Sequence, residues 1–287
     1  MPSLRDIRKR IASVKNTQKI TNAMKMVAAA KLRRAEEAVT AARPYSDKMR
    51  DVLASLASRV NPGAHPLLQT SEVSKVILLQ MTADRGLCGG FNANLNRRAE
   101  AFVREMNSKG VEVALVNVGR KGHDYFRRRR ITIAGRFLNV MNSVSLELAQ
   151  EISSAVIEQF LSKEYQEVHI LYNRFRTAAS QILTLRKLLP ISPPEAEEKK
   201  QLEYLYEPSE EALLDGILPK YVEVQILTGL LDSVASEQGA RMTAMEAATS
   251  NAEDMIYRLT LRLNRLRQES ITKELMEIVG GAEALKG

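Results

Sequence analysis

The sequence predicts an α/β fold in which an α/β domain is inserted between two long terminal helices that pair as an antiparallel coiled coil. Residues 3–43 contain neither proline nor glycine, and neither do residues 240–279. Between them, short apolar runs alternate with helical patterns, as is typical of a largely parallel sheet. We therefore expect an N-terminal coiled-coil helix in residues 1–61, an α/β domain in residues 62–208 and a C-terminal coiled-coil helix in residues 209–287.

The N-terminal helix begins with a capping signal, because Ser3 is followed three residues later by Asp6. A stripe with three- and four-residue spacing then predicts a coiled-coil seam that becomes small and polar in its middle turns. A second stripe takes over on a neighbouring face. The seam comprises Leu4, Ile7, Ile11, Val14, Gln18, Thr21, Lys25, Ala28, Leu32, Ala35 and Val39, and the second stripe comprises Ile20, Ala23, Met24, Val27 and Ala30.

The C-terminal helix carries a matching stripe. Gly280 and Gly281 predict its end. Gly239 inside it costs roughly 1 kcal/mol against alanine, so it marks close packing or a local flex point. Because neither helix buries its seam alone, the two favour antiparallel pairing. The stripe comprises Leu231, Val234, Gln238, Arg241, Met245, Ala248, Ala252, Met255 and Leu259, and a stronger one follows at Ile256, Leu259, Leu263 and Leu266.

The middle part alternates between strand and helix signals. Apolar, β-branched runs predict strands, and four-residue periodicity predicts helices. The expected strands are residues 73–81, 111–118, 131–133, 168–172 and 178–189, and the expected helices are residues 91–108, 120–130 (a short helix or a loop) and 143–163.

Composition excludes several classes of protein. Of the 287 residues 45% are hydrophobic and 26% charged, which excludes wholesale disorder. The single cysteine, Cys88, excludes an internal disulfide and a cysteine-based metal site, and the three histidines are scattered. No apolar stretch of about 18 residues is present, and the first residues are charged, which argues against a signal peptide. We expect a soluble, intracellular protein without a metal.

The positive charge is concentrated at the N-terminus, where residues 1–50 hold 13 Lys and Arg against 4 Asp and Glu. Such a segment suits nucleic acid, an anionic membrane surface or an acidic protein partner. The first 44 residues contain no aromatic side chain, which disfavours a single-strand binder. For the four consecutive arginines of residues 127–130, a solvated face or an acidic neighbour is favoured over nucleic acid.

The loop in residues 82–92 is the nearest approach to a catalytic motif. Its glycines follow a strand and precede a helix, a position that can hold phosphate. The spacing is G-x-x-G-G rather than a dinucleotide-binding pattern, so we favour a structural turn. For Cys88 we favour a small buried residue over a nucleophile, because no base is paired with it by pattern. Neither paired carboxylates nor a triad order indicates an enzyme.

The longest motifs lie at the two ends of the chain. The chain resembles the gamma subunits of F-type ATP synthases, of the bacterial type, over its whole length and in the right order. The motifs that carry the resemblance are residues 11–28 (IASVKNTQKITNAMKMVA), 84–90 (DRGLCGG), 204–208 (YLYEP), 236–249 (SEQGARMTAMEAAT) and 267–274 (RQESITKE).

The resemblance implies a non-catalytic central rotor shaft without cofactors, an antiparallel coiled coil with a Rossmann-like domain beside its foot. Its partners would be a ring of three alpha and three beta subunits, an epsilon subunit and a proton-driven membrane ring, at the cytoplasmic face of a bacterial membrane. It would couple rotation to ATP synthesis and take part in regulating hydrolysis. The implied head contacts are Met24, Arg241, Gln268 and Thr272, and the implied membrane-ring contacts are Tyr204, Tyr206 and Glu207.

Two further expectations accompany the resemblance. The apolar, small residues 275–285 suit a tip that turns in a hydrophobic bearing. A single Cys88 excludes the regulatory dithiol of chloroplast relatives, and the family motif starts at once, without a transit peptide, which favours a bacterial origin. The rivals are a basic coiled-coil protein that binds nucleic acid and a nucleotide binder that uses residues 86–90.

Overall fold

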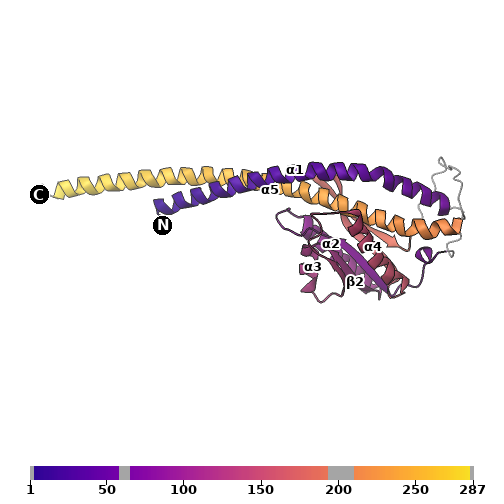
Figure 1. The fold of residues 1–287 in the computed structure, drawn as a ribbon. Coiled ribbons are helices and arrows are strands. Elements are labelled where there is room, and N and C mark those ends of the chain that lie inside the picture. Colours follow the sequence, from indigo (N-terminus) through magenta and orange to yellow (C-terminus); the bar gives the residue numbers. More distant parts are fainter. Residues whose placement is uncertain (1–2, 58–64, 193–209, 285–287) are drawn as a thin grey trace. The chain divides into compact units, whose positions relative to one another are not determined.

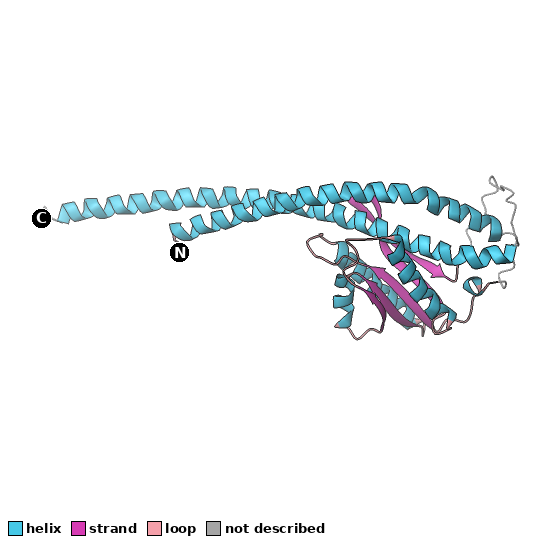
Figure 2. Ribbon diagram, viewed as in Figure 1, coloured by secondary structure: helices cyan, strands magenta, loops and turns pink. Residues whose placement is uncertain are grey.

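The computed structural model describes residues 3–57, 65–192 and 210–284 (Figures 1 and 2). The chain divides into two compact units, one formed by Met1–Val27 with Met242–Gly287 and the other by Ala28–Arg241. Helices α1 (Leu4–Ala57) and α5 (Glu210–Ala284) contribute to both units. The domain boundaries expected after residues 61 and 208 fall outside the described residues, so they stay a prediction.

The second unit contains a five-stranded sheet with the order β3-β2-β1-β4-β5. All neighbours are parallel except β4 and β5, which form an antiparallel hairpin. The largely parallel sheet expected from the sequence is confirmed, and its first four strands follow the doubly wound order in which ligands bind where the order reverses. The strands are β1 (Lys75–Met81), β2 (Glu112–Val118), β3 (Ile133–Phe137), β4 (Glu167–Thr177) and β5 (Ser180–Leu189).

Helices cover both faces of this sheet. Because β1 and β2 are buried on both sides, their alternate side chains enter two different cores. Helices α2 (Phe91–Ser108) and α3 (Arg120–Arg127) pack over Val76, Leu78 and Leu115. On the opposite face, α4 (Leu146–Leu161) and α5 pack over Ile77, Leu79 and Val116. A short 3₁₀ turn, η2 (Pro66–Leu68), precedes β1.

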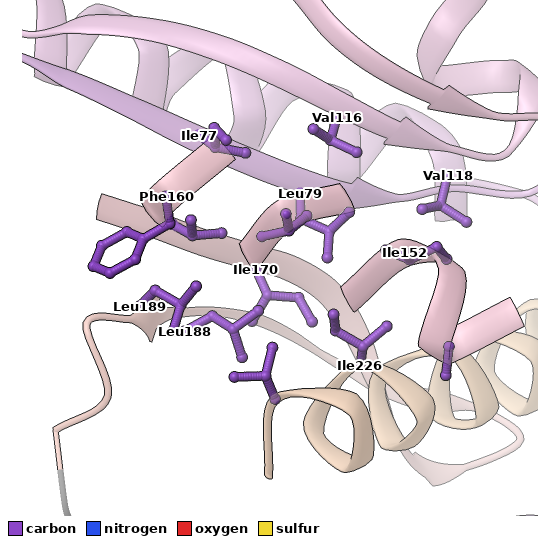
Figure 3. Packing of buried hydrophobic residues seen from close by; sticks show 14 of the residues in the cluster. Ile77, Leu79, Val116, Val118, Ile152, Phe160, Ile170, Leu188, Leu189 and Ile226 are labelled. Carbon is purple, nitrogen blue, oxygen red and sulfur yellow. The ribbon is translucent and has the colours of Figure 1, made fainter. Parts of the chain in front are cut away.

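Figure 3 shows the second of these cores, with strand residues facing α4 and α5. Ile152 and Phe160 reach it from α4, and Ile226 reaches it from α5. Burial of a large aliphatic side chain contributes roughly 2 kcal/mol. The helix that continues into the other unit is therefore also a structural layer of the α/β domain.

The α1 seam is confirmed by burial. Ile7 and Thr21 are buried in the first unit, and Ala28, Leu32, Ala35 and Val39 are buried in the second. The second stripe does not take over, since Ile20 is 60% and Val27 is 57% exposed. The polar position Thr21 stays in the seam because its hydroxyl contacts that of Thr249 on α5.

The α5 stripe is confirmed except at one position. Met245 and Ala252 are buried, and the seam then continues through half-buried Ile256 and Leu259. Met255 is 51% exposed, so its expected seam position is wrong. Ile256, four residues after Ala252, lies on the same face of the helix as Ala252. Met255, the residue before Ile256, therefore points to a different side of the helix.

Helix boundaries differ from the expectation at glycine but not at proline. The capping box is confirmed, because the Ser3 hydroxyl donates to Asp6 Oδ2 at 2.8 Å and the Asp6 amide donates back at 3.2 Å. Helix α1 continues through Pro44, with buried Val39 and Leu53 anchoring both flanks. The stop expected at Gly280 and Gly281 is wrong, since α5 runs on to Ala284; no described contact explains why.

The observed strand boundaries differ from the expected ones mainly where polar residues interrupt the apolar pattern. The structure extends β4 through Thr177, five residues past the expected end, because its polar end pairs with β5. It places β3 at Ile133–Phe137 rather than at residues 131–133. Gly135 and Arg136 interrupt the apolar run there, and β3 is a half-exposed edge strand.

Gly239 marks close packing rather than a flex point. It is buried in α5, and a Cβ at this position would lie 3.0 Å from the carbonyl oxygen of Ala178 and 3.1 Å from its Cα. Ala178 belongs to the turn between β4 and β5. The missing side chain therefore lets the backbone of α5 approach the backbone of this turn.

We predict opposite effects for alanine at two α5 glycines. Gly216 has no neighbour within 4 Å of a built Cβ, so Gly216→Ala is expected to raise the free energy of unfolding by up to about 1 kcal/mol through helix propensity. Gly239→Ala is expected to lower it by roughly 1 kcal/mol because the Ala178 backbone has to move. Denaturant unfolding measures both. Equal stabilisation by the two variants would contradict the close approach.

Candidate functional site

Polar side chains link the two helices of the first unit. They form three successive layers in the part of the seam where the sequence turns polar, and two threonine hydroxyls form the central layer. The pairs are Gln18 Nε2 with Glu253 Oε1 at 3.1 Å, Thr21 Oγ1 with Thr249 Oγ1 at 2.8 Å and Lys25 Nζ with Glu246 Oε1 at 3.4 Å. Positions rise along α1 as they fall along α5, which confirms antiparallel pairing within this unit.

These layers also line a polar groove on the first unit. Its charged walls combine lysines from α1 with glutamates from α5, so it presents both signs of charge and favours neither an anion nor a cation. The lining residues are Gln18, Lys19, Asn22, Lys25, Glu246, Thr249, Ser250 and Glu253. We interpret the groove as a device that fixes the register of the two helices, because polar seam positions specify alignment at some cost in stability.

The register leaves the end of α5 without an α1 neighbour. Extending the pairing of Lys25 with Glu246 brings Leu4 level with Arg267, so the rest of α5 overhangs the start of α1. Gln268 and Thr272 lie on this overhang and are exposed, and the Thr272 hydroxyl donates to the Gln268 carbonyl at 2.9 Å. Apolar side chains are also at least half exposed there, namely Ile271, Leu275, Met276, Ile278 and Val279.

Arg241 lies in the second unit, and its side chain is only 12% exposed. One guanidinium nitrogen, Nη2, lies 2.7 Å from Glu237 Oε1 and donates to the carbonyl oxygen of Gly86 at 3.2 Å. Burial raises the pKa of the Glu237 carboxyl, and the Arg241 charge opposes that shift. Glu237 was not among the residues expected at the site, although its four-residue spacing from Arg241 is the sequence signal for such a pair.

The loop between β1 and α2, which contains Gly86, is held by the chain's own carboxylate. Asp84 Oδ1 accepts from the amides of Arg120 at 3.0 Å and Asn139 at 2.8 Å, and Oδ2 accepts from that of Met141 at 3.0 Å. Backbone amides at this edge of a doubly wound sheet are the groups that bind phosphate elsewhere. Here Asp84 occupies three such amides, after β2 and after β3, so the loop is held as a turn by the chain itself, in line with the structural interpretation.

Cys88 lies buried in the same loop. Burial raises the pKa of its thiol, with the nearby Glu237 carboxylate adding to the shift. A high thiol pKa disfavours the thiolate that a nucleophile requires. The structure therefore supports the expectation of a small buried residue.

Helix α5 covers the place where the strand order reverses, between β1 and β4. A Cβ on Gly229 would lie 3.1 Å from Met81 Sδ at the end of β1. Ser236 Oγ donates to the carbonyl of Asn173, and Asp232 Oδ1 accepts from the Phe175 amide at 3.4 Å. These positions sit at three- and four-residue steps along one face of α5. The crevice that receives a ligand in other doubly wound proteins is therefore filled by this helix.

Comparison with known proteins identifies the family. A family model described as ATP synthase matches residues 3–285. The ATP synthase gamma chain of Geobacter metallireducens is 52% identical, and that of Pelotomaculum thermopropionicum is 51% identical, each with 100% of both chains covered. The chain belongs to the ATP synthase gamma chain family. The resemblance drawn from the terminal motifs is thus confirmed, and the function of this family is that of the central rotor shaft of ATP synthase.

Solved structures show the same fold. A chain of the mitochondrial ATP synthase of Euglena gracilis superposes with a TM-score of 0.73 at 24% identity, covering 98% of this chain and 94% of that one. A chain from the central stalk and c-ring of the Tetrahymena thermophila mitochondrial enzyme gives a TM-score of 0.61 at 25% identity, covering 80% and 99%. The expected coiled coil with an inserted Rossmann-like domain is confirmed.

The four expected head contacts are divided between the two units. Met24, half-buried on α1, shares the first unit with Gln268 and Thr272, whereas Arg241 is internal to the second. The expected membrane-ring contacts Tyr204, Tyr206 and Glu207 lie outside the described residues. Within residues 3–57, 65–192 and 210–284, no cluster of metal-binding side chains is found. The helices in these ranges include none with the length and hydropathy to cross a bilayer.

We predict that Asp232 makes stability depend on pH. Burial raises the pKa of this carboxyl above its ordinary 3.8, although the Phe175 amide and Arg43, Arg174 and Arg186 oppose the shift. The native state then binds more protons than the unfolded state just above pH 3.8, so stability falls as pH rises there.

Asp232→Asn keeps an oxygen for the Phe175 amide and removes the titration. This substitution is expected to raise the denaturation midpoint at pH 7 and to reduce the dependence of stability on pH. The dependence that remains includes a contribution from Glu237. Asp254→Asn, at an exposed α5 position, is the control and is expected to change neither. A lower midpoint for Asp232→Asn at pH 7 would show that the charge itself stabilises the fold.

Proposed function

We propose that the chain is a non-catalytic shaft whose first unit turns inside a ring of three alpha and three beta subunits, where the nucleotide sites lie. The observation that carries this proposal is the α5 overhang, a helix end with exposed apolar side chains and no α1 neighbour. Exposed apolar surface of this kind marks an interaction site. A surrounding ring of protein would cover it on all sides.

The shaft would present different surfaces to identical catalytic subunits. Along the paired part of the first unit, α1 offers the exposed Ile20 and Val27, while α5 offers Met255 and Tyr257. An asymmetric rod inside a three-fold ring gives each catalytic subunit a different neighbour. The polar layers at Thr21 would keep the two helices in register while the rod rotates.

The family of the chain favours an acidic protein partner over nucleic acid at the basic start of α1. The basic side chains there are exposed, and Arg5, Arg8 and Lys9 share one face of the helix, with Arg10 beside it. We propose that they face acidic loops of the surrounding subunits, with epsilon and the membrane ring bound elsewhere on the chain. The residues proposed for the ring are Tyr204, Tyr206 and Glu207. The assembly would hold the chain peripherally at the cytoplasmic face of a bacterial membrane.

Reconstitution with matching alpha and beta subunits tests this function. The chain is expected to co-elute at one copy per three alpha–beta pairs and to raise their steady-state ATP hydrolysis. Deleting residues 271–287 is expected to weaken coupling while leaving assembly intact. A chain that stays apart from the hexamer would refute the rotor proposal.

The head contacts proposed at Gln268 and Thr272 have a matched control. In a coupled system, Gln268→Ala with Thr272→Ala is expected to reduce ATP synthesis severalfold, by removing exposed polar groups that face the ring. Thr260 is also exposed on α5, and its hydroxyl donates to Ile256 just as that of Thr272 donates to Gln268. Thr260→Ala controls for the loss of that bond. Equal synthesis by both variants would remove the proposed role.

A further inference from the structure

Two side chains of α5 connect this helix to the loop that follows β1. Arg241 Nη2 bridges Glu237 on its own helix and the Gly86 carbonyl on the loop. Both side chains are nearly buried, with 12% of Arg241 and 7% of Glu237 exposed. A charged pair at this depth holds its geometry, because removing one partner leaves the other charge buried and unpaired.

Both ends of the loop are anchored to the α/β domain. Asp84 accepts three backbone amides, from Arg120 at the start of α3 and from Asn139 and Met141 after β3. At the other end of the loop, Asn92 Oδ1 accepts from the Ala83 amide at 2.9 Å. The Gly86 carbonyl lies between these two attachments, so a force on it passes through them to β1, β3 and α3.

A different face of α5 is attached to β4. Ser236 donates to the Asn173 carbonyl, and Asp232 accepts from the Phe175 amide. At 3.6 residues per turn, Arg241 lies about 140° around the helix from Ser236. A helix held along one face can roll about its axis, whereas attachments on two separated faces oppose that rotation. A torque on a shaft acts to produce this rotation.

We propose that Glu237, Arg241 and the Gly86 carbonyl form a latch that transmits torque between the α/β domain and α5. The proposal rests on the rotor function above and assigns positioning roles to both side chains. It differs from the head contact expected for Arg241, because the guanidinium acts inside the chain. Glu237 holds the guanidinium in place, and the Gly86 carbonyl receives it.

A double-mutant comparison in the reconstituted proton-pumping complex tests the latch. Glu237→Gln and Arg241→Gln are each expected to lower the protons pumped per ATP hydrolysed by about threefold, and the double variant by no more, since all three remove one interaction. Arg241→Lys keeps the charge but loses the forked donor, and is expected to recover part of the ratio. Arg33→Gln, from the exposed pair with Glu37 on α1, is the control.

Hydrogen exchange in the same complexes separates loss of the latch from misfolding. Amides of residues 85–90 are expected to exchange faster in the Glu237→Gln and Arg241→Gln variants, while those of β1 and β4 keep their protection. General loss of protection in β1 would assign the pair to folding and overturn the proposal.

The other outcomes are equally distinct. If Arg241→Gln lowers the pumping ratio while Glu237→Gln behaves like the Arg33 control, Arg241 acts on another subunit and the latch is wrong. If neither variant changes the ratio, the latch carries no torque. Failure of the rotor function itself looks different, because the unsubstituted chain would then not assemble with alpha and beta subunits.

Discussion

The fit of α5 against the carboxyl edge of the sheet determines most of what the second unit can do. Between residues 229 and 241 this helix is rich in glycine and in buried polar side chains, which are poor choices for an isolated helix. Contacts with the α/β domain explain several of them: Gly239 meets the backbone of Ala178, and Ser236 donates to the carbonyl of Asn173. The domain is consequently built around a helix where related folds hold a ligand.

The same helix packs differently in the first unit. There α5 pairs with α1 through small and polar residues, and the Thr21–Thr249 contact fixes which positions face each other. Apolar side chains outside this seam, such as Ile20, remain exposed instead of competing for it. In the second unit α5 is therefore packed against the α/β domain, whereas in the first unit it pairs with α1.

Much of the fold was predictable because periodicity reports burial directly. The α1 seam, the capping box at Ser3 and the order of strands and helices follow from local pattern alone. The failures include the helix stop expected at Gly280 and Gly281, because glycine lowers helix stability without excluding the helical conformation, and the seam position expected for Met255. The candidate site was harder to predict from the sequence than the fold. Gln268 and Thr272 came from family motifs, whereas the partnership of Glu237 and Arg241 with Gly86 joins positions about 150 residues apart, which no local pattern encodes.

Hydrogen exchange along α5 in the full chain tests most directly whether the α/β domain is built around this helix. Amides of residues 229–241 are expected to be among the slowest to exchange, opening together with those of β1 and β4, because they lie within one packed core. Amides of the overhang, residues 268–284, are expected to exchange orders of magnitude faster, since no α1 segment covers them. Exchange of residues 229–241 at the rate of the overhang, with β1 and β4 still protected, would mean that the domain folds without α5 and would contradict the account.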